Sequence, residues 1–123
     1  MARPQKIRFI CCPPESNRFG PIDSNLLKSS SENLSKVILT FDEYETIRLI
    51  DLLGLDQFEC ADHMNIARST VQLIYENARK KIADSIVNNK ILVIEGGNYK
   101  VCEAKGYKSR LCKKLNCKRL NNR

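Results

Sequence analysis

The segment from Cys60 to Ile82, CADHMNIARSTVQLIYENARKKI, constrains the fold of this chain more than any other part of the sequence. Ala61 is a small residue that lets two helices cross closely, and Asn65, four positions later, tolerates the left-handed backbone of a tight turn. The apolar positions that would pack behind such a crossing hold Cys60, Met64, Ile66, Val71 and Ile74. This spacing predicts a helix-turn-helix, a motif whose second helix enters the major groove of DNA.

Apolar spacing and capping residues predict three helices. The first lies within LTFDEYETIRLIDLLG, begins with a capping box of Thr40 and Glu43, and ends at the left-handed stop of Gly54. The second spans roughly 56–64, and the third, the recognition helix, spans about 67–87. Helical spacing links Phe41, Tyr44, Ile47, Ile50 and Leu53 on the first helix, and one buried stripe of Val71, Ile74, Ala78, Ile82 and Ile86 on the third.

Short strands are expected on both sides of the helices. The segment KIRFI (6–10) predicts an N-terminal strand, and KILVIEGGNYKV predicts a β-hairpin with strands at 91–94 and 99–101 around two glycines. Prolines and glycines break regular structure over 11–23, and the serine-rich stretch 24–36 reads as a loop. The predicted fold is mainly α, with a three-helix helix-turn-helix core, a wing-like C-terminal β-hairpin and a short N-terminal strand.

Length and charge bound the organisation of the chain. The 123 residues fit one domain, and we expect a DNA-binding domain over 1–101, with its core at 37–101, followed by a basic cysteine-containing tail at 102–123. The net charge of +7 favours a polyanionic partner such as nucleic acid, an anionic membrane or an acidic protein. No apolar run approaches the roughly 18 residues of a membrane span, and no signal peptide is evident. A cytoplasmic location without a membrane partner is therefore expected.

The start of the third helix carries the residues predicted to contact double-stranded DNA. Arg68, Ser69 and Gln72 offer donors for base edges or phosphates, and Thr70 offers a hydroxyl and a methyl group. Arginine favours guanine and glutamine favours adenine through paired hydrogen bonds, each pair worth about 1–3 kcal/mol of discrimination. The N–H groups at the start of the helix also suit a phosphate. One such unit reads only a few base pairs, so a homodimer on a two-fold site fits this prediction.

Other residues of the same helix modify this prediction. Arg79, Lys80 and Lys81 are expected to meet backbone phosphates, which position a protein without reading sequence. Ala67 lacks the side chain that normally caps a helix start, at a cost of about 1 kcal/mol. Glu76 is acidic, so its part of the surface is expected to point away from DNA.

Cysteines flank the helical core at both ends. If the strand at 6–10 pairs with the 91–101 region, a thiolate from Cys11 or Cys12 would join Cys102, Cys112 and Cys117 around zinc or an iron–sulfur cluster. The candidate metal ligands are thus Cys12, Cys102, Cys112 and Cys117. The chain has no C-x-x-C pair, and a set of free thiols is the alternative.

The remaining reactive residues have structural explanations. Cys60 is expected to be core packing beside the helix crossing, and His63 an exposed helix residue. Helix capping and solvation account for Asp42, Glu43 and Glu45. No catalytic constellation of serine, histidine and acid is visible, nor a glycine-rich phosphate loop, so an enzyme is not expected.

The opening MARPQKIRFICCPPESNRFGP, the helix LTFDEYETIRLIDLLG and the closing EGGNY together resemble uncharacterised protein family 0251, also called domain-of-unknown-function family 134, over about 1–101. Members of this family are predicted DNA-binding proteins. The helical core is also similar to the last DNA-binding region of sigma-70-type factors, region four, which reads promoter elements with a helix-turn-helix. The resemblance implies a DNA-binding role for Arg68, Ser69, Thr70 and Gln72. Ala67 departs from the family pattern, because relatives tend to carry serine there.

Three classes of function follow from these residues. The first is a bacterial-type transcriptional regulator that reads a short DNA site. The second is a cytosolic metal- or redox-sensing protein whose cysteines form the primary site; some relatives joined to a domain similar to those that bind the nitrogenase iron–molybdenum cofactor point in this direction. The third is a protein-docking or RNA-binding module, because three-helix units also bind such partners.

Overall fold

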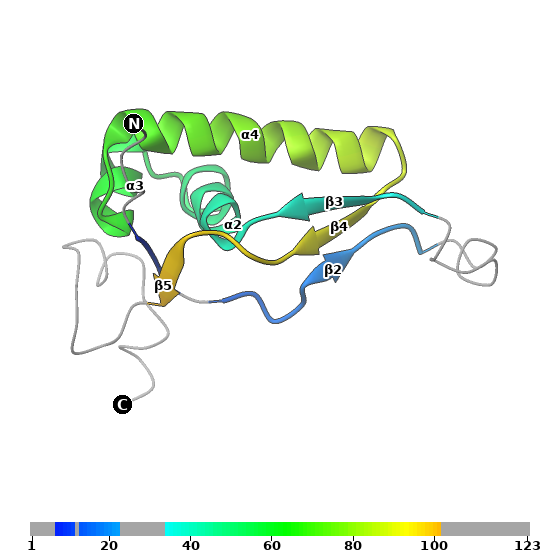
Figure 1. The fold of residues 1–123 in the computed structure, drawn as a ribbon. Helices are drawn as coiled ribbons and strands as arrows, with labels where there is room; N and C mark the ends of the chain where they lie inside the picture. The colour runs from blue at the N-terminus through cyan, green and yellow to red at the C-terminus, as the bar shows by residue number, and fades with distance from the viewer. Residues whose placement is uncertain (1–6, 12, 23–33, 102–123) are drawn as a thin grey trace, which may run out of the picture.

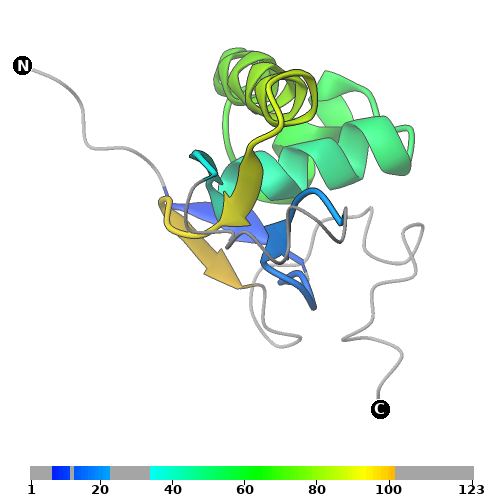
Figure 2. The ribbon, with the colours of Figure 1, turned by 90° about the vertical axis from the view of Figure 1, so that its right-hand side faces the viewer.

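The computed structural model describes residues 7–11, 13–22 and 34–101. Along the chain these residues form β1 (Arg8–Ile10), β2 (Arg18–Phe19), β3 (Lys36–Leu39), α2 (Phe41–Ile47) with its π-helical continuation η2 (Arg48–Leu52), α3 (Gln57–Met64), α4 (Arg68–Val87), β4 (Ile91–Ile94) and β5 (Tyr99–Val101). Figure 1 shows α4 along one side of the molecule, with α3 at its N-terminal end and α2 and the strands beneath it. Figure 2 shows the same arrangement from the side, with the helices gathered above the strands.

The three predicted helices are present close to their predicted bounds. The capping box at the start of α2 is confirmed, because the Thr40 N–H donates to Glu43 Oε1 at 2.9 Å. Gly54 has the expected left-handed backbone, with a φ of 80°. Asn65 closes α3 with a φ of 58° and a ψ of 46°, which confirms the left-handed turn predicted there. Within the described ranges, no helix combines the length and apolar character that crossing a bilayer requires.

The strands form two small sheets, and the predicted hairpin between 91–94 and 99–101 is wrong. Both strands exist, but β4 lies between β3, which is parallel to it, and β2, which is antiparallel. β5 pairs instead with β1 in parallel, with Ile10 opposite Val101. β4 is apolar and largely buried. Its two edges pair with β2 and β3, which both come from earlier in the sequence. Gly96 and Gly97 then lead the chain from one sheet to the other instead of folding it back.

Other strand predictions have mixed outcomes. The strand predicted at 6–10 and its expected pairing with the 91–101 region are confirmed by β1 and β5. β2 lies in the stretch 11–23, where prolines and glycines predict irregular structure, and β3 begins at the end of the predicted loop 24–36. Most of that loop lies outside the described residues.

Two groups of buried side chains hold the helices in place. The first group packs α3 against α4 and contains every residue predicted for the helix crossing; its members are Leu49, Leu55, Cys60, Ala61, Met64, Ile66, Val71 and Ile74. The second group joins α4 to α2 and the sheet through Leu39, Ala78 and Ile94, with partly buried apolar neighbours. Burying apolar surface in this way is the main source of stability for such a domain.

The buried stripe predicted for the third helix ends earlier than expected. Ile86 is 74% exposed, so its assignment to the buried face of α4 is wrong. Ser85 is buried instead, and its hydroxyl donates to the Ile82 carbonyl at 2.9 Å. On the first helix Leu49 is fully buried, whereas Leu53 is exposed, because the chain changes to a π-helical turn at Arg48.

Candidate nucleic-acid interface

The junction between α3 and α4 determines which side chains reach solvent. A capping box starts α3, because the Glu59 N–H donates to Asp56 Oδ1 at 2.7 Å and the Asp56 N–H donates to Glu59 Oε1 at 3.2 Å. After the left-handed turn, the Ile66 N–H donates to the Ala61 carbonyl at 3.0 Å. α4 therefore begins immediately after a short, fixed connection, with its apolar face packed on α3.

The start of α4 has no capping side chain, as the sequence predicts. Ala67 is the N-cap residue, in an extended backbone conformation and without a side-chain cap. Its carbonyl accepts the N–H groups of Thr70 and Val71 at 3.1 Å each. The backbone N–H groups ahead of Thr70 lie at the positive end of the helix dipole, which suits an anion.

Arg68 is held by side chains from both helices. Its Nη1 donates to Gln57 Oε1 on α3 at 2.9 Å and lies 3.5 Å from Gln72 Oε1 on α4. The guanidinium carbon lies 5.4 Å from the centre of the Phe58 ring, within the range of a cation–π contact. The predicted base-reading arginine is therefore exposed but oriented by its neighbours.

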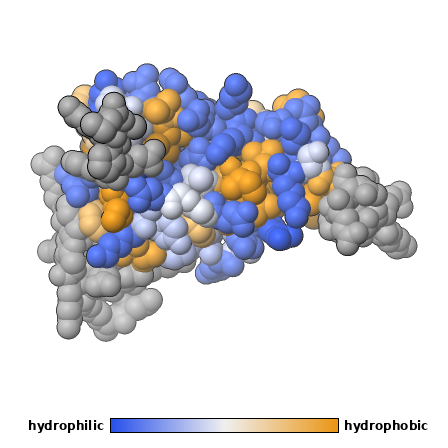
Figure 3. Space-filling model, viewed as in Figure 1, coloured by the Kyte–Doolittle hydropathy of each residue, from blue (hydrophilic) through white to orange (hydrophobic). Residues whose placement is uncertain are grey.

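The other predicted contact residues surround Arg68 on α4. Ser69 and Gln72 are exposed, and Thr70 is half-buried. The Gln72 amide nitrogen lies 3.4 Å from Glu76 Oε1. Glu76 is therefore on the same exposed row as Arg68 and Gln72. On the face shown in Figure 3, hydrophilic residues predominate along α4.

The predicted phosphate contacts differ in their surroundings. Lys80 is exposed. Arg79 is also exposed, with its Nε 3.6 Å from Asp51 Oδ2 and its guanidinium 5.3 Å from the centre of the Tyr75 ring. Tyr75 donates its hydroxyl to Asp51 at 2.6 Å, and this hydrogen bond raises the pKa of the tyrosine. Lys81 instead forms an ion pair within the protein, because its Nζ lies 2.7 Å from Glu43 Oε1 on α2.

Helix capping is confirmed for Glu43, but all three acids of α2 are buried, so the solvation part of the prediction for Asp42, Glu43 and Glu45 is wrong. Glu45 is fully buried, receives two hydrogen bonds from Arg48 at 2.6 and 3.1 Å, and accepts the backbone N–H of Cys11. Asp42 lies 3.6 Å from Arg8 of β1. These acids face cations and N–H donors from β1, η2 and α4, which compensate the cost of burying charge.

His63 is also buried, at 4% exposure, and the prediction that it is exposed is wrong. α3 packs against β1 as well as α4, so more of its surface is covered than a helix pair alone would cover. Burial lowers the pKa of His63 below its ordinary value of 6.5. The prediction for Cys60 is confirmed, because it is fully buried in the core and burial raises its pKa to about 12.

The cysteine site cannot be built from the described part of the chain. Cys12, Cys102, Cys112 and Cys117 all lie outside the described residues. Cys11 and Cys60 are described, and both are buried. Within the described ranges, no group of three or more histidine, cysteine or acidic side chains has an arrangement that suits a metal ion.

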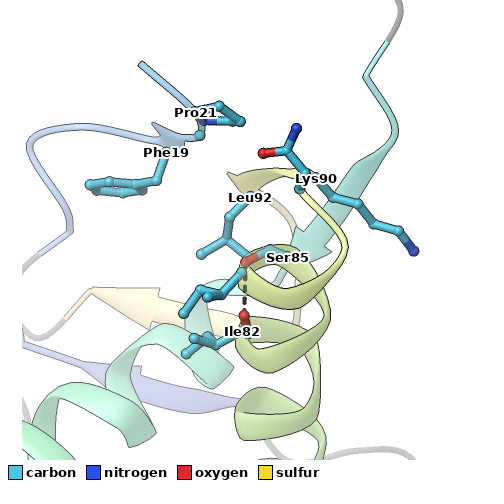
Figure 4. A pocket seen from close by; sticks show the side chains of 9 residues that line it. Phe19, Pro21, Ile82, Ser85, Lys90 and Leu92 are labelled. Atoms are coloured by element: carbon cyan, nitrogen blue, oxygen red, sulfur yellow. Dashed lines mark hydrogen bonds between the residues drawn. The ribbon is translucent and has the colours of Figure 1, made fainter. Parts of the chain in front are cut away.

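A pocket of about 380 Å³ lies beside the C-terminal half of α4, far along the helix from Arg68. Figure 4 shows Phe19, Pro21, Ile82 and Leu92 around the pocket, with the Ser85 hydroxyl hydrogen-bonded to the Ile82 carbonyl. Lys90 is at its edge and pairs with Asp84 at 2.9 Å. The lining is mostly apolar and brings together no set of reactive side chains.

Comparison with known proteins places this arrangement in a family. Residues 1–102 match the family model described as protein of unknown function DUF134. The chain belongs to the DUF134 family. The matched range contains every described helix and strand of this DUF134 chain and all seven residues predicted to contact DNA.

Several proteins named UPF0251 are similar to this DUF134 chain. One from Desulfitobacterium hafniense is 58% identical over 106 residues, which cover 86% of this chain and 81% of the relative. One from a Thermoanaerobacter species is 45% identical over 103 residues, or 84% of this chain and 87% of the relative. One from Methanococcus maripaludis is 38% identical over 127 residues, or 98% of this chain and 93% of the relative. No solved structure matches the chain.

Proposed function

We propose that this DUF134 protein is a sequence-specific DNA-binding protein and a transcriptional regulator. In this proposal α3 and α4 form a helix-turn-helix, and the first two turns of α4 enter the major groove. The observation that supports it most is the position of Arg68, exposed at the first residue of α4 and oriented by Gln57 and Gln72. An arginine fixed at this end of a helix suits paired hydrogen bonds to guanine.

The surroundings of Arg68 support the same proposal. Ser69 and Gln72 present further hydrogen-bonding groups on the exposed side of the helix. Lys80 and Arg79 lie two to three turns further along, where a helix leaving the groove would approach a phosphate strand. The net charge of +7 favours association with a polyanion in general. A homodimer on a two-fold site would double the number of base pairs read.

Selection from random duplex DNA tests the proposal. Duplexes bound by the full chain would be enriched, and binding to the enriched site and to scrambled DNA would be measured over a range of salt concentrations. Arg68→Ala should weaken binding to the enriched site by about tenfold to a hundredfold and leave scrambled DNA almost unchanged. Lys80→Ala should weaken both equally and reduce the slope of log affinity against log salt by about one.

Lys36→Ala is the matched control, because it removes one exposed positive charge from β3 and leaves α4 intact. It should change the binding to either duplex by far less than Lys80→Ala. A protein that binds no duplex at low salt, or Arg68→Ala that loses affinity equally for all sequences, would contradict base reading by α4.

Metal or redox sensing is a second candidate function, and the pairing of β1 with β5 favours it. The register places Ile10 opposite Val101, and in the sequence Cys11 and Cys12 follow Ile10, and Cys102 follows Val101. Protein purified without oxygen should then contain stoichiometric zinc or iron that Cys112→Ser removes. Metal-free protein with unchanged DNA affinity would leave DNA binding as the sole proposal.

A further inference from the structure

Two residues of α3, Gln57 and Phe58, contact Arg68 but have no part in base reading in the function proposed above. Gln57 is the first residue of α3, and its Oε1 accepts a hydrogen bond from Arg68 at 2.9 Å. Phe58 follows it and is 70% exposed, although a phenylalanine in solvent gains nothing from hydrophobic burial. The Arg68 guanidinium lies over the Phe58 ring. The first turn of α3 and the first residue of α4 therefore form one continuous surface.

The hydrogen bonds of Arg68 to described residues use only one of its three guanidinium nitrogens. Both of its contacts with glutamine side chains use Nη1. A guanidinium has five N–H donors, so Nε and Nη2 still carry three, two of which point in parallel along their shared edge. Guanine presents two acceptors, O6 and N7, on its major-groove edge, and they require such a pair of donors. Gln57 therefore holds Arg68 by one nitrogen in an orientation that leaves a guanine-binding edge available.

The exposed ring of Phe58 suits a different feature of the groove. The thymine 5-methyl group is the apolar feature that base edges present in the major groove, and apolar side chains recognise it by contact. Because the Phe58 ring lies against the Arg68 guanidinium, it would contact the base pair next to the guanine that Arg68 binds. We propose that α3 takes part in base reading: Gln57 positions Arg68 on a guanine, and Phe58 contacts the methyl group of a thymine in the neighbouring base pair.

This inference rests on the proposed DNA-binding function and adds a specific preference to it. The preferred site should contain a thymine adjacent to the guanine that Arg68 contacts. In this assignment Gln57 is a positioning residue, because it acts through Arg68, whereas Phe58 touches the base pair itself. If Phe58 instead contacts an apolar surface of another protein, the affinity for DNA should not depend on its ring.

Modified bases in the selected duplex test both parts with the full-length protein. Replacing the neighbouring thymine by deoxyuridine removes only the methyl group, and should weaken wild-type binding by about fourfold. Phe58→Ala should bind the two duplexes equally. Ile86→Ala is the matched control, because Ile86 is 74% exposed near the far end of α4, away from Arg68, and this variant should keep the wild-type response to deoxyuridine.

Replacing the guanine by 7-deazaguanine removes the N7 acceptor and tests Gln57. Wild type should lose about fivefold or more in affinity, Arg68→Ala should lose nothing further, and Gln57→Ala should show a reduced loss. A general loss of folding would weaken binding to all duplexes and would leave these ratios unchanged.

The outcomes separate the two levels of the proposal. If a preferred duplex is selected but deoxyuridine has no effect at any thymine, or Phe58→Ala keeps the wild-type response, the role of α3 is wrong and DNA binding stands. If Gln57→Ala keeps the full response to 7-deazaguanine, the positioning role is wrong. If no duplex binds at low salt, both levels fail together.

Discussion

Lys81 on α4 and Glu43 on α2 form an ion pair across the core, with Nζ 2.7 Å from Oε1. The same carboxylate oxygen accepts the Thr40 N–H at 2.9 Å. The Glu43 side chain is 8% exposed and the Lys81 side chain is 35% exposed. One oxygen atom therefore both caps the start of α2 and ties this helix to the middle of α4.

Lys81→Met should lower the free energy of unfolding by about 1–2 kcal/mol, because the change leaves Glu43 buried without its cation. The effect should remain below that of a fully buried pair, since Lys81 is partly exposed. Denaturant unfolding followed by circular dichroism would measure the loss.

Lys80→Met is the matched control for this prediction. Lys80 is the preceding residue and is exposed, so the same substitution there should change stability by less than about 0.5 kcal/mol. For DNA affinity the order of the two variants should be reversed, with Lys80→Met weakening binding more than Lys81→Met. Equal stability of the two variants would show that the Glu43 pair contributes little.

Glu43 also illustrates how far the sequence predicts this fold. Its capping box with Thr40 is predictable because the two residues are three apart and follow a local rule. The same holds for the turn at Asn65 and for the apolar residues behind it, which all depend on spacing within one short segment. The pairing with Lys81 is not predictable, because it joins residues 38 positions apart.

The errors share this dependence on distant contacts. The segment at 91–94 looks like half of a hairpin, yet its neighbours in the sheet, β2 and β3, come from much earlier in the chain. His63 looks exposed until α3 is packed against β1 as well as α4. In the candidate site, the exposed position of Arg68 could be predicted from spacing within one segment, whereas its hydrogen bond with Gln57 depends on how α3 crosses α4.

Ala67→Ser should stabilise the protein by about 1 kcal/mol, because a serine at the N-cap accepts an N–H of the first turn that Ala67 leaves without a side-chain partner. Thermal unfolding would measure the change. Ala83→Ser is the control, because Ala83 is exposed in the middle of α4, where serine is a poorer helix former than alanine. This second variant should be slightly less stable than wild type. Equal effects at both positions would contradict the absence of a cap at Ala67.

Glu76→Gln should strengthen binding to duplex DNA by about twofold to fivefold at low salt, because it removes a negative charge from the surface that carries Arg68. The glutamine still offers an oxygen to Gln72, so the local hydrogen bond can persist. Glu95→Gln is the control, since it removes the same charge from an exposed position after β4. A fluorescence anisotropy titration at several salt concentrations would compare them. If both variants gain equally, the effect belongs to net charge and not to the α4 surface.

Stability should fall as the pH is lowered through 6.5, because burial lowers the pKa of His63 in the folded protein. In the unfolded chain the pKa of His63 stays near 6.5. Below pH 6.5 the unfolded chain therefore binds a proton at His63 more readily than the folded protein does, and this protonation favours unfolding. The contribution is fully present above pH 6.5 and is lost progressively as the pH falls toward the folded pKa, by up to about 1.4 kcal/mol per pH unit. His63 is the only histidine in the chain, so His63→Gln should flatten the free energy of unfolding between about pH 5 and 7. Urea unfolding at each pH would measure this slope, and a variant with the slope of wild type would assign the pH dependence to other groups.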